Sequence, residues 1–274
     1  MPNGEHPHSG QYSRYVALGD SQTEGLGDGD DTVGLRGFAD RLAEQLTAVN
    51  PGLQYANLAV RGLVAGQVRT GQLEPALAMR PDLATVVAGV NDLLRPRFDA
   101  AEVAGQVEAM FAALTAAGAH VVTVTFPDVG KIVPLARPVR SRVFELNARI
   151  RVAAARHGVT VAETGRQAVT ADPRMWSVDR LHASSLGHER IAAAIAQALH
   201  LPGSDDAWTL PLPPQRVPAG LRATAAELRW AGEFLGPWLG RRLRGQSSGD
   251  GRTAKRPQLL PLLAAAGAPA DLSS

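Results

Sequence analysis

The chain has 274 residues, of which 45% are hydrophobic and 20% charged, and it contains no cysteine. This is the composition of a folded globular protein and excludes a chain that is disordered throughout; the lack of cysteine excludes disulfides, thiolate metal sites and a catalytic thiol. The formal net charge is only +2, and the basic cluster near the C-terminal end is short and not interleaved with aromatic residues, so we expect no nucleic-acid partner.

The N-terminal segment 1–12 is polar, and we expect it to be disordered. It has no apolar core flanked by basic residues, and no uncharged apolar run in the chain approaches the roughly 18 residues of a membrane span. We therefore expect a soluble, cytoplasmic protein without a signal peptide or a transmembrane segment.

From residue 13 to residue 201, short apolar runs alternate with longer segments of helical periodicity. The runs predict strands at 15–18, 53–58, 83–88, 121–126 and 159–161. Apolar residues at helical spacing predict helices around 38–49, 103–114, 143–153 and 186–199. Strand followed by helix, repeated, indicates an α/β fold in which helices cover both faces of a parallel five-stranded sheet.

Beyond residue 201 the composition changes. Prolines at 202, 211, 213, 214 and 218 predict an extended linker over 202–218, and an apolar stripe with Trp230 and Trp238 predicts an amphipathic helix over 219–244. Residues 245–274 are rich in Ser, Gly, Ala and Pro, which predicts a flexible tail. Two roles for the helix stay open: peripheral contact with a membrane or partner, or packing on the α/β domain or in a homodimer.

The first polar segment with potential chemistry is 19–25, Gly-Asp-Ser-Gln-Thr-Glu-Gly, directly after the first predicted strand. Ser21 then lies at the carboxyl edge of the sheet, where open α/β sheets bind ligands. Its hydroxyl can act as a nucleophile, and backbone N–H groups at a helix start can stabilise an oxyanion. The same residues also suit a helix cap or a turn, so the tripeptide alone does not decide between the two.

A serine nucleophile needs a base, and His182 is the histidine best placed for this role. It lies in an irregular stretch after the last predicted strand, and Asp179 precedes it by three residues. One turn brings the carboxylate to the imidazole and leaves the other ring nitrogen available, as the orienting role requires. The alternatives are a capping aspartate and an exposed loop histidine.

Two further residues follow strands on the same edge. Gly62 comes after the second predicted strand and Asn91, in Gly89-Val90-Asn91-Asp92, after the third. A glycine lets the backbone approach a ligand closely, and an asparagine side chain supplies an uncharged N–H donor. Either residue alone is more typical of a turn, but Ser21, Gly62, Asn91 and His182 together fall after successive strands.

In this order, Gly-Asp-Ser, a glycine, Gly-x-Asn-Asp and Asp-x-x-His resemble the four sequence blocks of the SGNH (GDSL-type) hydrolase family, over about residues 13–200. The resemblance implies a flavodoxin-like three-layer α/β/α sandwich. It also implies a triad of Ser21, His182 and Asp179, with the Ser21 N–H, the Gly62 N–H and the Asn91 side chain in the oxyanion hole. Gln22 stands where the family name puts leucine, a position at which we expect no chemistry.

The function implied is that of a serine esterase that hydrolyses small-molecule or lipid-like acyl esters through a covalent acyl-enzyme, with no cofactor and no metal. An acyltransferase, a thioesterase and a carbohydrate deacetylase remain alternatives on the same site, and a membrane- or partner-binding module is the alternative without catalysis. The acidic loop 25–37 is expected to rim the site, as a lid or as an ordinary flexible loop. Arg61, Arg95 and Arg97 are expected either to meet an anionic substrate or to be solvated.

Overall fold

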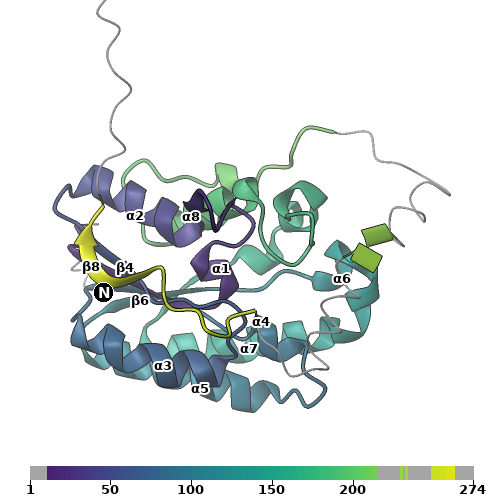
Figure 1. Cartoon of the computed structure of the whole chain (residues 1–274), viewed down its shortest axis with the longest axis horizontal. Coiled ribbons are helices and arrows are strands. Elements are labelled where there is room, and N and C mark those ends of the chain that lie inside the picture. The colour runs from purple at the N-terminus through teal and green to yellow at the C-terminus, as the bar shows by residue number, and fades with distance from the viewer. Residues whose placement is uncertain (1–10, 215–228, 231, 234–247, 263–274) are drawn as a thin grey trace, which may run out of the picture.

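The computed structural model describes residues 11–214, 229–230, 232–233 and 248–262, which form a six-stranded sheet between two layers of helices (Figure 1). The strand order across the sheet is β7-β6-β5-β1-β4-β8. All neighbours pair in parallel except β4 and β8, which are antiparallel. The strands are β1 (Arg14–Gly19), β4 (Gln54–Asn57), β5 (Leu83–Val87), β6 (His120–Val124), β7 (Thr160–Ala162) and β8 (Arg256–Pro261).

The register of the central strands brings the carboxyl ends of β1, β4 and β5 to one edge of the sheet. Gly19 at the end of β1 pairs with Val87 at the end of β5, and Ala17 pairs with Asn57 at the end of β4. β5 is buried along its whole length, as expected for a strand covered on both faces. The residues that follow these strands therefore meet at this edge.

Helices cover both faces, which confirms the predicted α/β/α sandwich. In Figure 1, α3, α5 and α7 lie on one side of the sheet, and α2 and α8 lie on the other. α2 buries Phe38, Leu42 and Leu46, which are four residues apart and so share one stripe. The longer helices are α2 (Phe38–Val49), α3 (Ala65–Ala78), α5 (Ala100–Ala116), α7 (Arg140–His157) and α8 (Ser185–Ala198).

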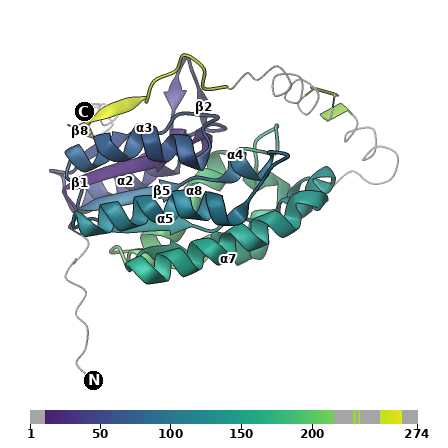
Figure 2. The ribbon, with the colours of Figure 1, turned by 90° about the horizontal axis from the view of Figure 1, so that it is seen from below.

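Two elements of the sheet and its helical layers differ from the sequence-based prediction. α3 was not predicted, because two glycines and Pro75 interrupt its pattern; Pro75 nevertheless lies inside the helix. The sheet has six strands and not five, because Arg256–Pro261 adds β8 at the β4 edge. The prediction of a flexible tail over 245–274 is therefore wrong for these six residues, which Figure 2 shows in yellow beside the sheet.

The segments at the domain ends are also more closely attached than predicted. Tyr12, placed in the expected disordered segment 1–12, is buried, and its hydroxyl lies 2.6 Å from Nδ1 of His120. In the predicted linker 202–218, Trp208 is buried and donates to Gln197 of α8 at 2.6 Å. Residues 1–10, and all but four positions of the predicted helix 219–244, lie outside the described residues.

None of the helices in the described part of the chain combines the length and the apolar character needed to span a membrane.

Candidate active site

Ser21 lies at the point where β1 ends and the short helix α1 (Ser21–Glu24) begins. Asp20 caps this helix by accepting a hydrogen bond from the backbone N–H of Gln22. Gly19 is required here, because a Cβ atom would lie 2.2 Å from Oγ1 of Thr23 and 2.5 Å from the carbonyl oxygen of Val87. The nucleophile candidate is thus held at the N-terminus of a helix, with only 8% of its surface exposed.

The backbone before Ser21 is fixed by a glutamine from α3. The Gln72 side chain accepts from the Gly19 N–H and donates to the Gly19 carbonyl oxygen, both at 2.9 Å. β4 pairs with β1 only as far as Ala17, and at Gly19 the buried amide of Gln72 makes the two hydrogen bonds that a neighbouring strand would otherwise make. Sequence reasoning missed this residue because α3 itself was not predicted.

His182 and Asp179 are joined as their spacing predicts. Nδ1 of His182 lies 2.6 Å from Oδ2 of Asp179, while Oδ1 of Asp179 accepts from the Ser177 hydroxyl at 2.6 Å and from the His182 N–H at 3.0 Å. Arg180 adopts a positive φ of 56° in the turn between the two residues. The carboxylate is thereby held within a loop that also carries the imidazole.

The electrostatics of Asp179 favour its charged form. Burial alone would raise the pKa of this carboxyl, but the hydrogen bonds and positive charge of His182, with the Ser177 hydroxyl, outweigh it and hold the pKa well below its usual value. Asp179 is therefore ionised at neutral pH. An ionised carboxylate accepts a hydrogen bond from Nδ1–H, which keeps the proton on Nδ1 and leaves Nε2 of His182 as the basic nitrogen.

Asn91 and Gly62 stand at the ends of β5 and β4. Asn91 lies in the short helix α4 (Val90–Leu93), and its Nδ2 donates to Oδ2 of Asp20 at 3.2 Å and to the Leu63 carbonyl oxygen at 3.0 Å. Gly62 has a φ of 79°, a left-handed conformation that favours glycine.

Asp20, which accepts the hydrogen bond from Asn91, has a raised pKa. Burial, together with nearby Asp92, raises the pKa of Asp20 to about 7 against the opposing effect of its hydrogen bonds and of His182.

One cavity of about 780 Å³ connects these residues. The structure brings together the predicted site residues, because all of them line this cavity: Ser21, Gly62, Asn91, Asp179 and His182.

The sequence of residues 17–190 matches the model of the GDSL-like lipase/acylhydrolase family. The chain belongs to this family. It is accordingly an enzyme that hydrolyses ester bonds, as the order of the sequence blocks implies. A search of curated proteins found no similar sequence.

Solved structures with the same fold include several esterases. An α/β hydrolase from the metagenome of Lake Arreo superimposes with a TM-score of 0.57 at 21% identity, covering 69% of this chain and 95% of its own. A lipase/acylhydrolase from Enterococcus faecalis gives 0.55 at 23% identity, covering 68% and 95%. An acetylxylan esterase from Geobacillus stearothermophilus gives 0.56 at 18% identity, covering 68% and 94%.

Within this GDSL-type fold, most of the cavity wall is apolar. The wall includes α6 (Val129–Ile132), the adjacent 3-10 helix η1 (Pro134–Val139) and the first turn of α7. Trp176 and Trp230 also line the cavity, and the indole of Trp230 donates to the Val178 carbonyl oxygen at 3.1 Å. The apolar side chains on the α6–α7 side include Ile132, Val133, Val139 and Val143.

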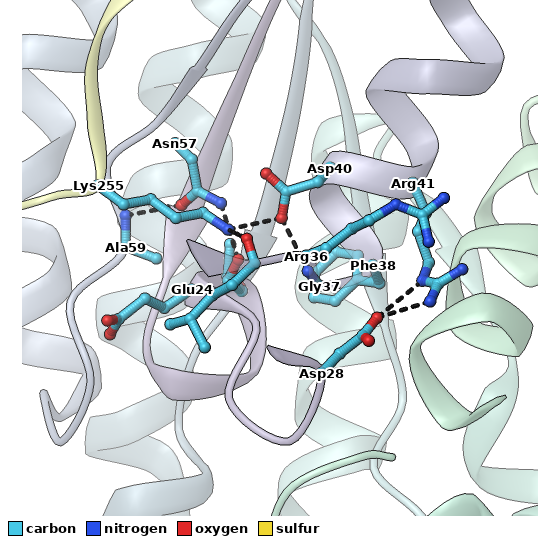
Figure 3. Close-up of polar contacts among 12 residues, drawn as sticks. Glu24, Asp28, Arg36, Gly37, Phe38, Asp40, Arg41, Asn57, Ala59 and Lys255 are labelled. Carbon is cyan, nitrogen blue, oxygen red and sulfur yellow. Dashed lines mark hydrogen bonds and ion pairs between the residues drawn. The ribbon is translucent and has the colours of Figure 1, made fainter. Parts of the chain in front are cut away.

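The acidic loop 25–37 rims the cavity, to which it contributes Leu26, Gly27 and Gly29. Part of it is a short hairpin of β2 (Gly29–Asp30) and β3 (Gly34–Leu35). Figure 3 shows how Asp28 at its base binds the Arg41 guanidinium of α2, at 2.7 Å. The loop is thus tied to the helical layer by an ion pair.

Arg61, Arg95 and Arg97, which lie close in sequence to Gly62 and Asn91, do not form an anion-binding group. Arg61 is buried and binds Glu24 at 2.6 Å and Asp31 at 2.9 Å, so its charge is already compensated within the protein. Arg95 and Arg97 are absent from the cavity wall formed by the described residues. These contacts argue against the expectation that the three arginines meet an anionic substrate.

Proposed function

We propose that this enzyme is a serine esterase that cleaves carboxylic esters through a covalent acyl-enzyme formed on Ser21. The observation that carries this proposal is the juxtaposition of Ser21 and the Asp179–His182 pair on one cavity, with the pair joined at 2.6 Å. A nucleophile, a base and a group that orients the base are the parts that acyl transfer requires.

The reaction has two stages. Nε2 of His182 accepts the Ser21 proton as the hydroxyl oxygen attacks the ester carbonyl, and the imidazolium then donates that proton to the departing alcohol. In the second stage His182 activates a water molecule, which releases the carboxylic acid and restores the serine. Asp179 stays ionised throughout and stabilises the imidazolium, since its pKa lies well below the usual value.

The oxyanion of the tetrahedral intermediate would be bound by the Ser21 N–H at the start of α1, the Gly62 N–H and the Asn91 amide. The Asn91 amide is held by the Leu63 carbonyl oxygen and makes its longer bond, 3.2 Å, to Asp20. An oxyanion can take the place of that longer bond. Because Ser21 is buried, donors directed at its oxyanion are worth more than they would be in water.

The wall of the cavity favours an ester with an apolar acyl chain over an acetylated sugar. Apolar side chains make up most of its lining, and of the polar ones outside the proposed site Gln22, Thr125 and Ser177 are already hydrogen-bonded within the protein, whereas a sugar requires several placed donors and acceptors. At the rim Val178 is 77% exposed, which gives an incoming apolar chain a first contact. The lipid-like member of the substrate alternatives is therefore the one we propose.

A panel of p-nitrophenyl esters of increasing acyl length, with an acyl-CoA and an acetylated xylo-oligosaccharide, tests both parts of the proposal. We expect kcat/KM to rise from acetyl to medium-chain esters and Ser21→Ala to abolish cleavage and fluorophosphonate labelling. Undiminished cleavage by Ser21→Ala would overturn the nucleophile assignment. A preference for the acetylated sugar would overturn the substrate assignment alone. When an alcohol is added to the reaction, free carboxylic acid as the product indicates hydrolysis, and a new ester indicates acyl transfer.

A further inference from the structure

The side chain of Gln22 connects the segment of the nucleophile to the loop of the histidine. Its Nε2 donates to the carbonyl oxygen of Leu181 at 2.9 Å, and its Oε1 accepts from the backbone N–H of Ala183 at 3.2 Å. These two residues are the immediate neighbours of His182 in the chain. One amide thus holds the backbone on both sides of the histidine.

Among the described residues, the other hydrogen bonds of His182 lie within its own loop. The Ser177 N–H donates to the His182 carbonyl oxygen at 2.8 Å, and Asp179 accepts from both the backbone and the ring of His182. These bonds orient the imidazole relative to Asp179, which belongs to the same loop. They do not fix the imidazole relative to Ser21, which lies on a different element.

A direct connection across that gap comes from Gln22. Among the residues that the structure describes, both hydrogen bonds between α1 and the loop 177–183 are made by its side-chain amide. Gln22 directly follows Ser21 within α1, so its two hydrogen bonds link the backbone of the proposed nucleophile to the backbone around His182. The position at which the family resemblance led us to expect no chemistry therefore joins the two halves of the proposed site.

We propose that Gln22 is a positioning residue that sets the placement of the His182 imidazole relative to the Ser21 hydroxyl. This inference rests on the function proposed above. It requires an amide in particular, because the Leu181 carbonyl needs a donor and the Ala183 N–H needs an acceptor. Leucine at this position has neither group, and a glutamate carboxylate has only the acceptor.

Two variants with closely similar side-chain size test whether both hydrogen bonds are required. Gln22→Met keeps the length of the side chain and removes both hydrogen bonds, whereas Gln22→Glu keeps the bond to Ala183 and sets a carboxylate oxygen against the Leu181 carbonyl. On a p-nitrophenyl ester, we expect both to lower kcat by about 10- to 100-fold, because small misplacements of a catalytic group have effects of this size. KM should stay nearly unchanged, since Gln22 acts through His182 and not through the substrate.

The state of the His182–Asp179 hydrogen bond in the variant distinguishes a positioning role of Gln22 from a purely structural role. In proton NMR spectra of the full-length protein, we expect the low-field resonance of the Nδ1 proton to persist in Gln22→Met while kcat falls. Loss of that resonance would mean that Gln22 holds the loop as a whole and would overturn the positioning role. A rise in KM with unchanged kcat would assign Gln22 to substrate binding and would also overturn it.

A double-mutant cycle with His182→Ala tests whether the effect of Gln22 on the rate depends on His182. If Gln22 acts through His182, then Gln22→Met should cause no further loss of kcat/KM in the His182→Ala background. A full additional 10-fold loss there would contradict the inference. Undiminished activity of His182→Ala alone would instead overturn the proposed function, so the two failures are distinguishable.

Discussion

The side-chain amide of Asn91 donates to the carboxylate of Asp20 at 3.2 Å, next to the proposed nucleophile. This places the asparagine from the end of β5 against the residue that caps α1. The contact joins two of the four blocks from which the active site was predicted. It also gives the first test of the oxyanion hole.

We expect Asn91→Ala to lower kcat by about 10²- to 10³-fold, the usual effect of removing one oxyanion-hole donor. KM should change little, because the interaction forms mainly in the transition state. Steady-state kinetics on a p-nitrophenyl ester measure both constants, and thermal unfolding checks that the variant is folded. If kcat stays within a factor of about three of the unmodified enzyme, Asn91 is not an oxyanion donor.

His188 should make the protein less stable as the pH falls. Its Nε2 lies 2.9 Å from the Leu26 carbonyl oxygen, to which it must donate, and its Nδ1 accepts from the Phe38 N–H at 3.1 Å. Burial lowers the pKa of this imidazole to about 4, against the raising effect of Leu26 and Asp28. The unfolded chain therefore binds a proton below pH 6.5 that the folded protein does not bind until about pH 4.

The resulting loss of stability between pH 6.5 and pH 4 is about 3 kcal/mol for a shift of this size. Urea unfolding at a series of pH values measures it, with His188→Gln as the control that does not titrate. We expect the glutamine variant to be less stable at pH 7 but to lose less stability toward pH 4. Parallel curves for the two proteins would contradict the role of His188.

The contrast between His188 and the proposed triad shows which parts of the candidate site the sequence could predict. Asp179 and His182 are three residues apart, so their pairing depends on local geometry that the sequence displays. The partners of His188 and Gln22 lie 150 or more residues away, and no local pattern indicates such contacts. β8 was missed for the same reason, since two prolines in six residues give little strand signal without knowledge of β4.

Glu24 and Arg61 form a buried ion pair that should contribute strongly to stability. The carboxylate accepts from the backbone N–H of Arg61 at 2.6 Å and from its guanidinium at 2.6 and 2.9 Å, and both side chains are about nine-tenths buried. Glu24→Gln leaves the buried guanidinium with Asp31, which is about half exposed, as its remaining charged partner. We expect a loss of up to about 3–5 kcal/mol in the free energy of unfolding.

The pair of Arg36 and Glu44 provides the matched control. Its distance is the same, 2.6 Å, but the two side chains are 52% and 41% exposed. Glu44→Gln should therefore cost less than about 1 kcal/mol, as is usual for exposed pairs. Equal losses in the two variants, measured by urea unfolding, would show that burial does not determine the contribution of the Glu24–Arg61 pair.

The segment that leads into β8 should depend on pH through Lys255 and Asp40. Nζ of Lys255 donates to Asp40 at 2.6 Å and to the Leu35 carbonyl oxygen at 3.0 Å, which ties this segment to α2 and the acidic loop (Figure 3). Burial raises the pKa of Asp40, while the charge and hydrogen bond of Lys255 oppose the rise. Without the lysine, the pKa of the carboxyl rises further.

Lys255→Met should consequently destabilise the protein more at pH 8 than at pH 5. At pH 8 the unpaired Asp40 is buried with its charge, which costs about 1–3 kcal/mol or more, whereas near pH 5 it can take up a proton. A folded-state pKa above the unfolded value means that stability is lost as the pH rises through it. Arg252→Met is the control, because its partner Asp31 is half exposed and also binds Arg61, so we expect no such pH dependence. An equal loss for Lys255→Met at both pH values would show that Asp40 remains charged without its partner.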